Sequence, residues 1–388
     1  MRVETESRTV TFCQELVRLE SLSGQEQAVA DAVEREMTAL GYDAVHRDEW
    51  GDVIGLVKGK RCGNRVLFDA HMDVVPATEP ESWRYPPYSG ESADGRIWGR
   101  GATDIKGSLA ALVVGMGSIP REEIAGTIIV SASIGEERVE GMATTRVLGK
   151  YPAGTVVICE PTDLKLGLGH RGRASLVVEA AGKAAHTSRP ENGINAVYRL
   201  IEAVARIRGL PRETDALLGP GLIELVEISS QPFPGSSMVP YHAIARFDRR
   251  LVRSETRESV LGRMREVLAG LEGLAVRLHQ GELRCYTGRS IVAESFHPGW
   301  AIPQDHDLAR RAREALAGAG LAHETYYAPY CTNGASTAGE LGIPTIVYGA
   351  GEIGAAHAVD ETVGVDDLLA ACRGYQALAR GLTAGQPS

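Results

Sequence analysis

Residues 127–133 read TIIVSAS and residues 155–160 read TVVICE. Continuous, largely apolar runs of this length predict strands buried on both faces, as in the parallel sheets of α/β proteins. Helical periodicity appears on either side of them, at Ile105–Gly117, Asp307–Ala319 and Asp366–Leu382, and the first forty residues predict two more helices. Strands that alternate with helices in this way predict an α/β layer architecture.

The pattern changes in the middle of the chain. Predicted strands and helices there follow the order β-α-β-β-α-β, which is that of a ferredoxin-like module. Their residue ranges are 174–181, 194–208, 222–229, 243–251, 255–271 and 276–283. Because the α/β pattern resumes afterwards, we predict one discontinuous domain, residues 1–173 and 288–388, that carries an inserted second domain, residues 174–287.

Composition excludes several classes of protein. The chain has 388 residues, a net charge of −9 and no basic run, which argues against a nucleic-acid partner. No apolar stretch approaches the ~20 residues that a membrane-spanning helix needs, and the charged N-terminus does not read as a signal peptide. The six cysteines are isolated, which disfavours both a thiolate zinc cluster and a disulfide framework. We therefore expect a cytoplasmic protein without a membrane partner.

Acids and histidines follow several predicted strands of the α/β domain. Each has an ordinary explanation when it is taken alone: a structural His-x-Asp pair, a helix N-cap for Asp104, or a solvated loop for the adjacent acids. The residues are His71 and Asp73 in FDAHMD (68–73), Asp104 in GRGATDIKG (99–107), Glu136 and Glu137 in GEE (135–137), Glu160 in CEPT (159–162) and His357 in GAAHAVDE (354–361).

Taken together, these side chains predict a metal site. Ligands of open α/β sheets bind outside the carboxyl ends of the strands, and carboxylates gathered there repel each other unless a cation compensates them. A set of histidines and carboxylates without thiolates suits zinc, with manganese or cobalt as alternatives. The number of acids suggests two metal ions that share one carboxylate.

The ordered set of motifs resembles the dinuclear zinc amidohydrolases. These include acetylornithine deacetylase, succinyl-diaminopimelate desuccinylase, aminoacylase and the glutamate carboxypeptidases. The set is HMDVVPA, GRGATDIKG, GEE, CEPT, AAHTSRPENGINA and GAAHAVDE. The resemblance covers nearly the whole chain, and GHRGRASLVVEA and SFHPGWAIP look similar to a branch of hydrolases linked to selenium metabolism. The resemblance implies an α/β catalytic domain with the mixed sheet of the zinc exopeptidases and an inserted ferredoxin-like lid that also mediates dimerisation.

The resemblance also implies a role for each motif residue. His71 and Glu160 would hold one Zn²⁺, and Glu137 and His357 the other. Asp104 would bridge the two ions and precede a cis peptide. Asp73 would orient His71, and Glu136 would be the general base, taking a proton from the attacking water and delivering it to the departing amine.

Further residues are implied on the lid and in the substrate pocket. His186 would stabilise the oxyanion, in many relatives from the partner subunit of a homodimer. Arg250 would bind a substrate carboxylate, with the adjacent Arg249 as an alternative. Asn192, Asn333 and Gly334 would contact the substrate. The chain departs from the family at Gly135, where relatives often have Asp, and in the pocket sequences SMVP (237–240) and TNG (332–334), so the substrate of a named relative does not carry over.

The expected reaction is hydrolysis of an amide bond in a small N-acylated amino acid or short peptide. A dipeptidase or carboxypeptidase, a ureido-acid hydrolase and a metal-binding protein without catalysis are the alternatives. Retention of Glu136, which binds no metal in this scheme, argues against the last. Two GxGxxG matches, at 167–172 and 349–354, lack the context of a dinucleotide site, and no G-x-S-x-G elbow is present for a serine hydrolase.

Overall fold

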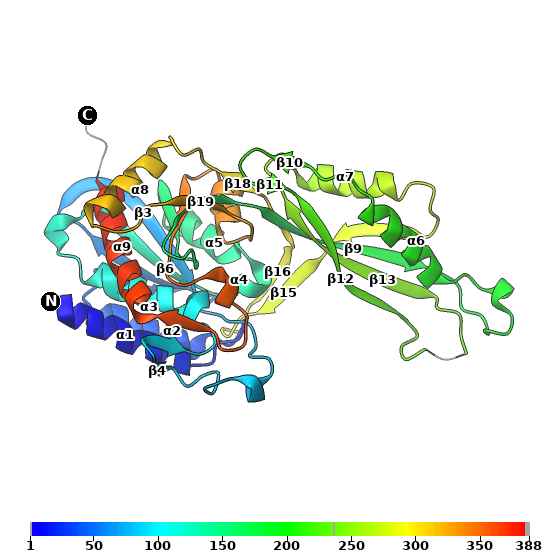
Figure 1. The fold of residues 1–388 in the computed structure, drawn as a ribbon, viewed down its shortest axis with the longest axis horizontal. Helices are drawn as coiled ribbons and strands as arrows, with labels where there is room; N and C mark the ends of the chain where they lie inside the picture. The colour runs from blue at the N-terminus through cyan, green and yellow to red at the C-terminus, as the bar shows by residue number, and fades with distance from the viewer. Residues whose placement is uncertain (1, 236, 385–388) are drawn as a thin grey trace.

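In the computed structural model, which describes residues 2–235 and 237–384, the chain forms two lobes (Figure 1). A larger α/β lobe contains both ends of the described chain, and a smaller lobe, which we call the lid, is made from the middle of the sequence. The fold class predicted from sequence is confirmed: the α/β lobe has a mixed sheet of nine strands and the lid a separate antiparallel sheet. Among the described residues, no helix is long and apolar enough to cross a membrane.

The large sheet is parallel at its centre, and its outer strands pair antiparallel except for β19, which is parallel to β8. Its order is β1-β2-β6-β3-β7-β20-β8-β18, with β19 also paired to β8. The pairs β6–β3, β3–β7 and β7–β20 are parallel. The strands are β1 (Ala44–Arg47), β2 (Val53–Lys58), β3 (Arg61–His71), β6 (Ala125–Ser133), β7 (Thr155–Ile158), β8 (Leu166–His170), β18 (Trp300–Ala301), β19 (Thr325–Ala328) and β20 (Thr345–Val347).

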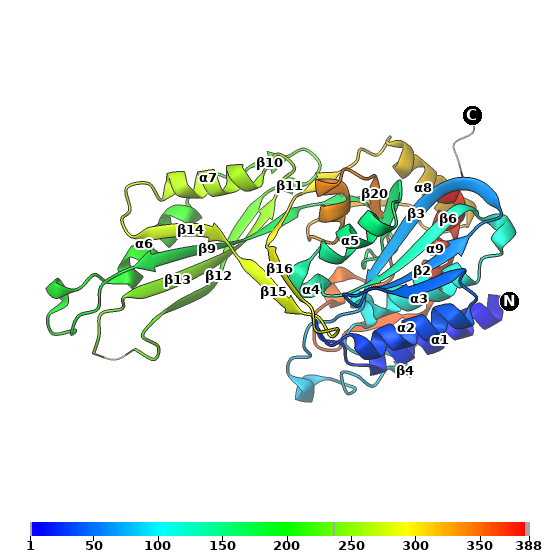
Figure 2. The same cartoon turned by 180° about the vertical axis from the view of Figure 1, so that it is seen from behind.

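Both faces of this sheet are covered, as the continuous apolar strands predicted. Alternate residues of β3 enter different clusters: Phe68 packs with the helices of one face and Leu67 with those of the other. The first face is covered by α1, α2, α3, α8 and α9 and the second by α5 (Figure 2). The helices are α1 (Arg2–Arg18), α2 (Gln27–Ala39), α3 (Gly107–Gly117), α4 (Glu136–Val139), α5 (Met142–Lys150), α8 (Asp307–Gly318) and α9 (Val365–Thr383).

The lid has the predicted β-α-β-β-α-β order. Its sheet runs β12-β13-β9-β14, and the short β17 extends it beside β9. Its core packs α6 and α7 against one face of the sheet. The elements are β9 (Gly172–Ala181), α6 (Ala196–Arg208), β12 (Leu222–Gln231), β13 (His242–Leu251), α7 (Arg257–Val267), β14 (Leu274–Leu278) and β17 (Phe296–His297). The domain boundaries at residues 173 and 287 stay a prediction.

One predicted strand, 276–283, is wrong in its extent. The chain leaves the lid sheet after Leu278, and β15 (Gln280–Arg284) pairs instead with β16 (Ser290–Glu294). Both strands lie between the lobes (Figure 2). The sequence also gave no prediction for the small sheets β4 (Glu91–Ala93), β5 (Arg96–Trp98) and β21 (Thr362–Gly364), or β10 (Thr214–Asp215) and β11 (Gly219–Pro220).

Candidate metal centre and substrate cavity

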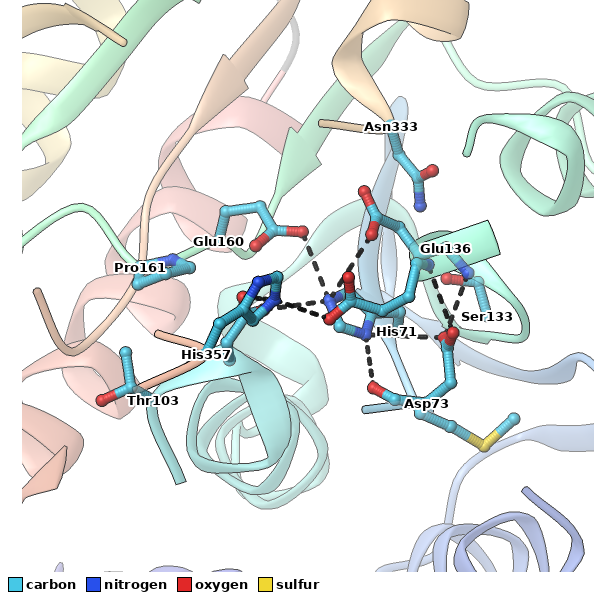
Figure 3. Close-up of polar contacts among 12 residues, drawn as sticks. His71, Asp73, Thr103, Ser133, Glu136, Glu160, Pro161, Asn333 and His357 are labelled. Atoms are coloured by element: carbon cyan, nitrogen blue, oxygen red, sulfur yellow. Dashed lines mark hydrogen bonds and ion pairs between the residues drawn. The ribbon is translucent and has the colours of Figure 1, made fainter. Parts of the chain in front are cut away.

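Three adjacent parallel strands bring the predicted residues together. β6, β3 and β7 end at Ser133, His71 and Ile158, on the same edge of the sheet. The chain continues from β6 into α4, which begins with Glu136 and Glu137, and from β7 to Glu160. Figure 3 shows Glu136 and Glu160 on two sides of His71, with His357 on the side of Glu160. The expected crevice at the carboxyl ends of the strands is therefore where the acids gather.

Asp104 lies between the two histidines. Its Oδ1 is 3.1 Å from Nε2 of His71, and its Oδ2 is 3.3 Å from Nε2 of His357. The alternative role as a helix N-cap is wrong, because α3 begins only at Gly107 and its N-cap position is Lys106. The peptide bond between Asp104 and Ile105 is cis, as the family resemblance implied. One carboxylate thus presents one oxygen to each histidine.

The remaining acids complete two groups around Asp104. Glu160 Oε1 is 3.7 Å from Nε2 of His71, and Glu137 Oε1 is 3.0 Å from Nε2 of His357. His357 has a φ of 61°, a left-handed conformation that is uncommon outside glycine and found most often at functional positions. The two groups are therefore His71, Asp104 and Glu160, and His357, Asp104 and Glu137.

These separations fit metal ligands. Nitrogen and oxygen ligands lie ~2.0–2.2 Å from Zn²⁺ in a tetrahedral site, which puts neighbouring ligand atoms roughly 3.4 Å apart. The spacings of 3.0–3.7 Å within the two groups bracket that value. Ligand atoms of His71, Asp104 and Glu137 also lie within 4.8 Å of one another, so the two groups adjoin. The donor set thus suits a pair of divalent cations.

The electrostatics of the cluster also call for cations. Burial raises the pKa of Glu136 and of Glu160 well above the usual carboxyl range, and neighbouring acids add to this shift. Hydrogen bonds to Asp104 and Glu137 raise the pKa of His357 to about 10. Carboxylates crowded into a buried site favour any positive charge that enters it, and bound divalent ions are the strongest such charges.

Asp73 contacts His71 and also the start of α4. Its Oδ1 lies 3.6 Å from Nδ1 of His71, whereas that Nδ1 lies 2.9 Å from the main-chain oxygen of Asp73. The carboxylate instead accepts the main-chain N–H groups of Glu136 and Glu137, at 3.0 and 3.2 Å, and the hydroxyl of Ser23. The prediction assumed extended chain as far as Asp73, but β3 ends at His71, so the two side chains are not simply parallel.

Glu136 is placed to act on a group bound at the cluster. Its side chain is 12% exposed, and Oε2 lies 4.0 Å from Nε2 of His71. It is the first residue of α4, preceded by Gly135 with a φ of 66°. A Cβ at Gly135 would come within 2.2 Å of a methyl group of Leu283, which gives a physical reason for glycine where relatives often have Asp.

A cavity of about 270 Å³, which we call the inner cavity, adjoins the cluster. Asp104, Glu137 and His357 line it on one side, and Arg250 lines it from the lid. Along β13, residues alternate between the buried and the open face. Arg249 therefore points the other way and is ion-paired with the buried Glu255. Of the two arginines, Arg250 is the one that lines the inner cavity, and its contact with a substrate carboxylate stays a prediction.

The lid residues His186 and Asn192 lie apart from the cluster within this chain. Neither His186 nor Asn192 is among the described residues that line the inner cavity. His186 is exposed, and its Nδ1 is 2.8 Å from the hydroxyl of Ser188, while Asn192 ends an exposed 3₁₀ turn, Pro190–Asn192. Their assignments to the oxyanion and the substrate stay predictions.

Asn333 and Gly334 belong to the scaffold behind the cluster. The amide of Asn333 donates to Asp69 at 2.8 Å and accepts the main-chain N–H of Gly141 at 2.7 Å. A Cβ at Gly334 would lie 2.9 Å from the indole nitrogen of Trp300, so glycine is needed there for packing. Neither Asn333 nor Gly334 is among the described residues that line the inner cavity. Their contact with a substrate stays a prediction.

Glu361 is a functional residue that the sequence reasoning missed. Its Oε1 accepts the main-chain N–H groups of Thr103 and Asp104, each at 2.9 Å, and its Oε2 binds the buried guanidinium of Arg100 at 2.5 Å. Glu361 therefore fixes the loop that presents Asp104. The sequence feature that could have indicated a role for Glu361 is its position four residues after His357 in the same motif.

The structure gives no support to a dinucleotide site. The first GxGxxG match runs through β8 into β9, and the second leads into the 3₁₀ turn Ile353–Ala355. Neither glycine run therefore opens the helix that would bind a pyrophosphate. The glycines of β8 have a packing role instead, since a Cβ at Gly169 would meet the backbone of Trp300 at 2.4 Å.

Comparisons with known proteins agree with this site. Residues 67–381 match the sequence profile of peptidase family M20/M25/M40. The chain is 30% identical over 378 residues to the uncharacterized protein YgeY of Escherichia coli K12, covering 95% of this chain and 92% of YgeY. It is 29% identical over 381 residues to a succinyl-diaminopimelate desuccinylase of Rhodospirillum centenum, covering 93% of each.

A solved structure shares the fold. The M20 family metallo-carboxypeptidase Sso-CP2 from Sulfolobus solfataricus superposes with a TM-score of 0.76 at 17% identity, over 97% of this chain and 99% of that protein. The finer resemblance to a selenium-linked branch stays a prediction.

Proposed function

The chain belongs to peptidase family M20/M25/M40, and on this premise we propose that it is a two-metal hydrolase of N-acylated amino acids, with Glu136 as its proton carrier. The observation that carries this proposal is the position of Asp104, whose two oxygens face two different histidines at 3.1 and 3.3 Å. A carboxylate in that position would be able to hold two ions, one through each oxygen. The proposed ions are Zn²⁺, with Co²⁺ or Mn²⁺ as alternatives.

The described side chains divide into the two expected ligand sets. His71 and Glu160 would hold one ion, His357 and Glu137 the other, and Asp104 both. When bound, such ions supply Lewis acidity toward a carbonyl oxygen and lower the pKa of a water molecule toward ~7. The main-chain carbonyl of Asp73 fixes the ring of His71 through Nδ1, so Nε2 would be the nitrogen that holds an ion.

Glu136 would move the proton. A buried carboxylate, with a pKa raised by burial, would accept a proton from the attacking water and return it to the departing amine. Its main-chain N–H is held by Asp73, so the start of α4 is fixed relative to His71. This arrangement supports Glu136 as a base and leaves the other acids to bind metal.

We propose that His186 supplies the oxyanion donor from the lid of a partner subunit. In the single chain His186 is exposed and is not among the described residues of the inner cavity, so the same chain's lid does not bring it to the cluster. A symmetric dimer through the lid would complete each site with a residue from the other copy. Lid closure would then exclude water from the reaction.

The substrate we propose carries a free carboxylate, which Arg250 would bind from the lid side of the inner cavity. The chain is similar in sequence to a desuccinylase and in fold to a metallo-carboxypeptidase. Removal of an acyl group and cleavage of a peptide are therefore the two reactions to distinguish. Six free cysteines suit a reducing compartment, and we propose the cytoplasm.

A hydrolysis panel tests the proposal. Metal-loaded protein would be assayed with N-acetyl, N-succinyl and N-carbamoyl amino acids and with dipeptides, by detection of the released amine. We expect turnover of acyl amino acids that is lost with a chelator and restored by Zn²⁺, Co²⁺ or Mn²⁺. Faster hydrolysis of dipeptides or of carbamoyl compounds would identify the corresponding alternative, and no hydrolysis of any member would contradict the proposal.

A further inference from the structure

Two arginines face each other across neighbouring strands of the lid sheet. Arg173 on β9 and Arg250 on β13 are directly opposite in the antiparallel register. Like charges in directly opposite positions destabilise a sheet. A pair of this kind therefore needs a compensating negative group close to both guanidinium groups.

Asp248 provides the compensation. It lies two residues before Arg250 on β13 and on the same open face of the strand. Its Oδ1 is 2.9 Å from Nε of Arg250, and its Oδ2 accepts the Nε–H of Arg173 at 3.0 Å. Among the described residues, Asp248 is the one hydrogen-bond or ion-pair partner of either guanidinium, so the terminal Nη groups of both have no direct partner. The negative charge of Glu140, which lines the same cavity, also acts on Arg173.

Both arginines reach the inner cavity that holds the metal cluster. Arg173 also lines an adjoining cavity of about 530 Å³, whose walls include Asp248 and His297. Arg173 thus lines both cavities, whereas Asp248 is among the described residues of the larger cavity alone. A substrate that reaches from the cluster toward the lid passes the two guanidinium groups.

We propose that Arg173 is a specificity-determining residue that binds, together with Arg250, one carboxylate of the substrate, and that Asp248 positions both arginines. Asp248 itself shows that a single carboxylate spans the pair, since each of its oxygens pairs with one guanidinium. A substrate carboxylate would use the Nη groups in the same way, with the planar geometry that favours arginine over lysine. The inference rests on the proposed function, which supplies the carboxylate-bearing substrate.

Binding to an inactive protein tests this inference separately from catalysis. Metal-loaded Glu136→Gln protein would be titrated calorimetrically with N-acetyl and N-succinyl amino acids and dipeptides, each compared with its C-terminal carboxamide. We expect the acid to bind at least ~10-fold more tightly than the amide. Arg173→Gln, added to the Glu136→Gln protein, should remove most of the preference for the acid. Arg173→Lys in the same background should keep part of this preference, and Asp248→Asn should weaken it.

Arg277→Gln is the matched control, because Arg277 on β14 pairs with Glu179 on β9 in the same sheet and is absent from the described walls of both cavities. It should leave the acid preference unchanged. The inference would be overturned if the Arg173→Gln protein still bound the acid more tightly than the carboxamide. It would also be overturned if the Glu136→Gln protein showed no such preference with any compound of the panel. If the wild-type protein hydrolyses none of these compounds while the Arg173-dependent preference is present, the proposed function fails and this inference stands.

Discussion

Asp73 accepts the main-chain N–H of Glu136 at 3.0 Å through one carboxylate oxygen. The other oxygen accepts the main-chain N–H of Glu137, so one buried carboxylate fixes the first turn of the short helix α4. That turn supplies both the proposed base and a proposed metal ligand. The geometry of the cluster therefore depends on a residue that need not bind metal.

Replacing Asp73 tests this dependence. Asp73→Asn presents an amide group to one of two N–H donors, so α4 should shift and activity should fall by ~10–100-fold, as for other partners of metal ligands. Steady-state kinetics with metal analysis measures the effect. Ser23→Ala, which removes only the hydroxyl donor to Asp73, is the control and should lose much less. Equal losses in the two variants would contradict the role given to the N–H groups.

Glu136→Gln should separate binding from chemistry. The amide keeps the size of the side chain but cannot accept the water proton, so turnover should fall by at least ~100-fold. Metal content should stay at the wild-type level. Glu137→Gln is the comparison and should lose metal together with activity. Loss of metal in Glu136→Gln would mean that Glu136 is a ligand.

His186→Ala should slow hydrolysis by ~100–1000-fold, the cost of one oxyanion donor. A 1:1 mixture of His186→Ala and Glu136→Gln subunits, after subunit exchange, should recover up to about a quarter of wild-type activity, because each mixed dimer contains one intact site. Activity assays before and after mixing provide the measurement. A mixture that stays inactive although subunits exchange would place His186 outside the partner's site.

His170 should make the protein sensitive to acid. Burial lowers the pKa of His170 from 6.5 to about 4, and its Nε2 accepts a hydrogen bond from the indole of Trp300 at 2.8 Å, which requires the neutral ring. The folded state then binds fewer protons than the unfolded state between pH 6.5 and 4. The free energy of unfolding should therefore decrease as the pH falls through this window, by up to about 3 kcal/mol.

Urea unfolding at several pH values measures this contribution. His170→Gln has no titrating ring and should show a shallower decrease between pH 6.5 and 4 than the wild type. An identical pH dependence in the two proteins would show that the histidine is not held neutral.

Much of the fold could be predicted from the sequence, because buried faces of helices and strands require apolar residues at regular spacings. The runs at 127–133 and 155–160 became β6 and β7, and the β-α-β-β-α-β order of the lid was correct. β8 was not recognised, because its sequence LGLGH carries two glycines that allow close packing of backbones and give no apolar pattern. Such a strand forms because of the strands that pair with it, and these are distant in the sequence.

The cluster was predicted through the position of acids at strand ends, and the structure brings His71, Asp104, Glu137, Glu160 and His357 together. Contacts that depend on main-chain geometry could not be predicted. Asp73 turned toward α4 because β3 ends at His71, and Glu361 was overlooked because its partners are the N–H groups of a loop more than 250 residues away. Side-chain type indicates chemistry, whereas the scaffold that orients it is set by the fold.

The most direct test of the two-ion site is the metal content of the wild type and of Asp104→Asn, measured by elemental analysis after reconstitution with Zn²⁺ and removal of loose ions. Since Asp104 faces both histidines, the account predicts two ions per wild-type chain and the weakening of both sites in Asp104→Asn, to less than one ion per chain. Two ions retained by Asp104→Asn, or a wild-type chain that never holds more than one, would contradict it.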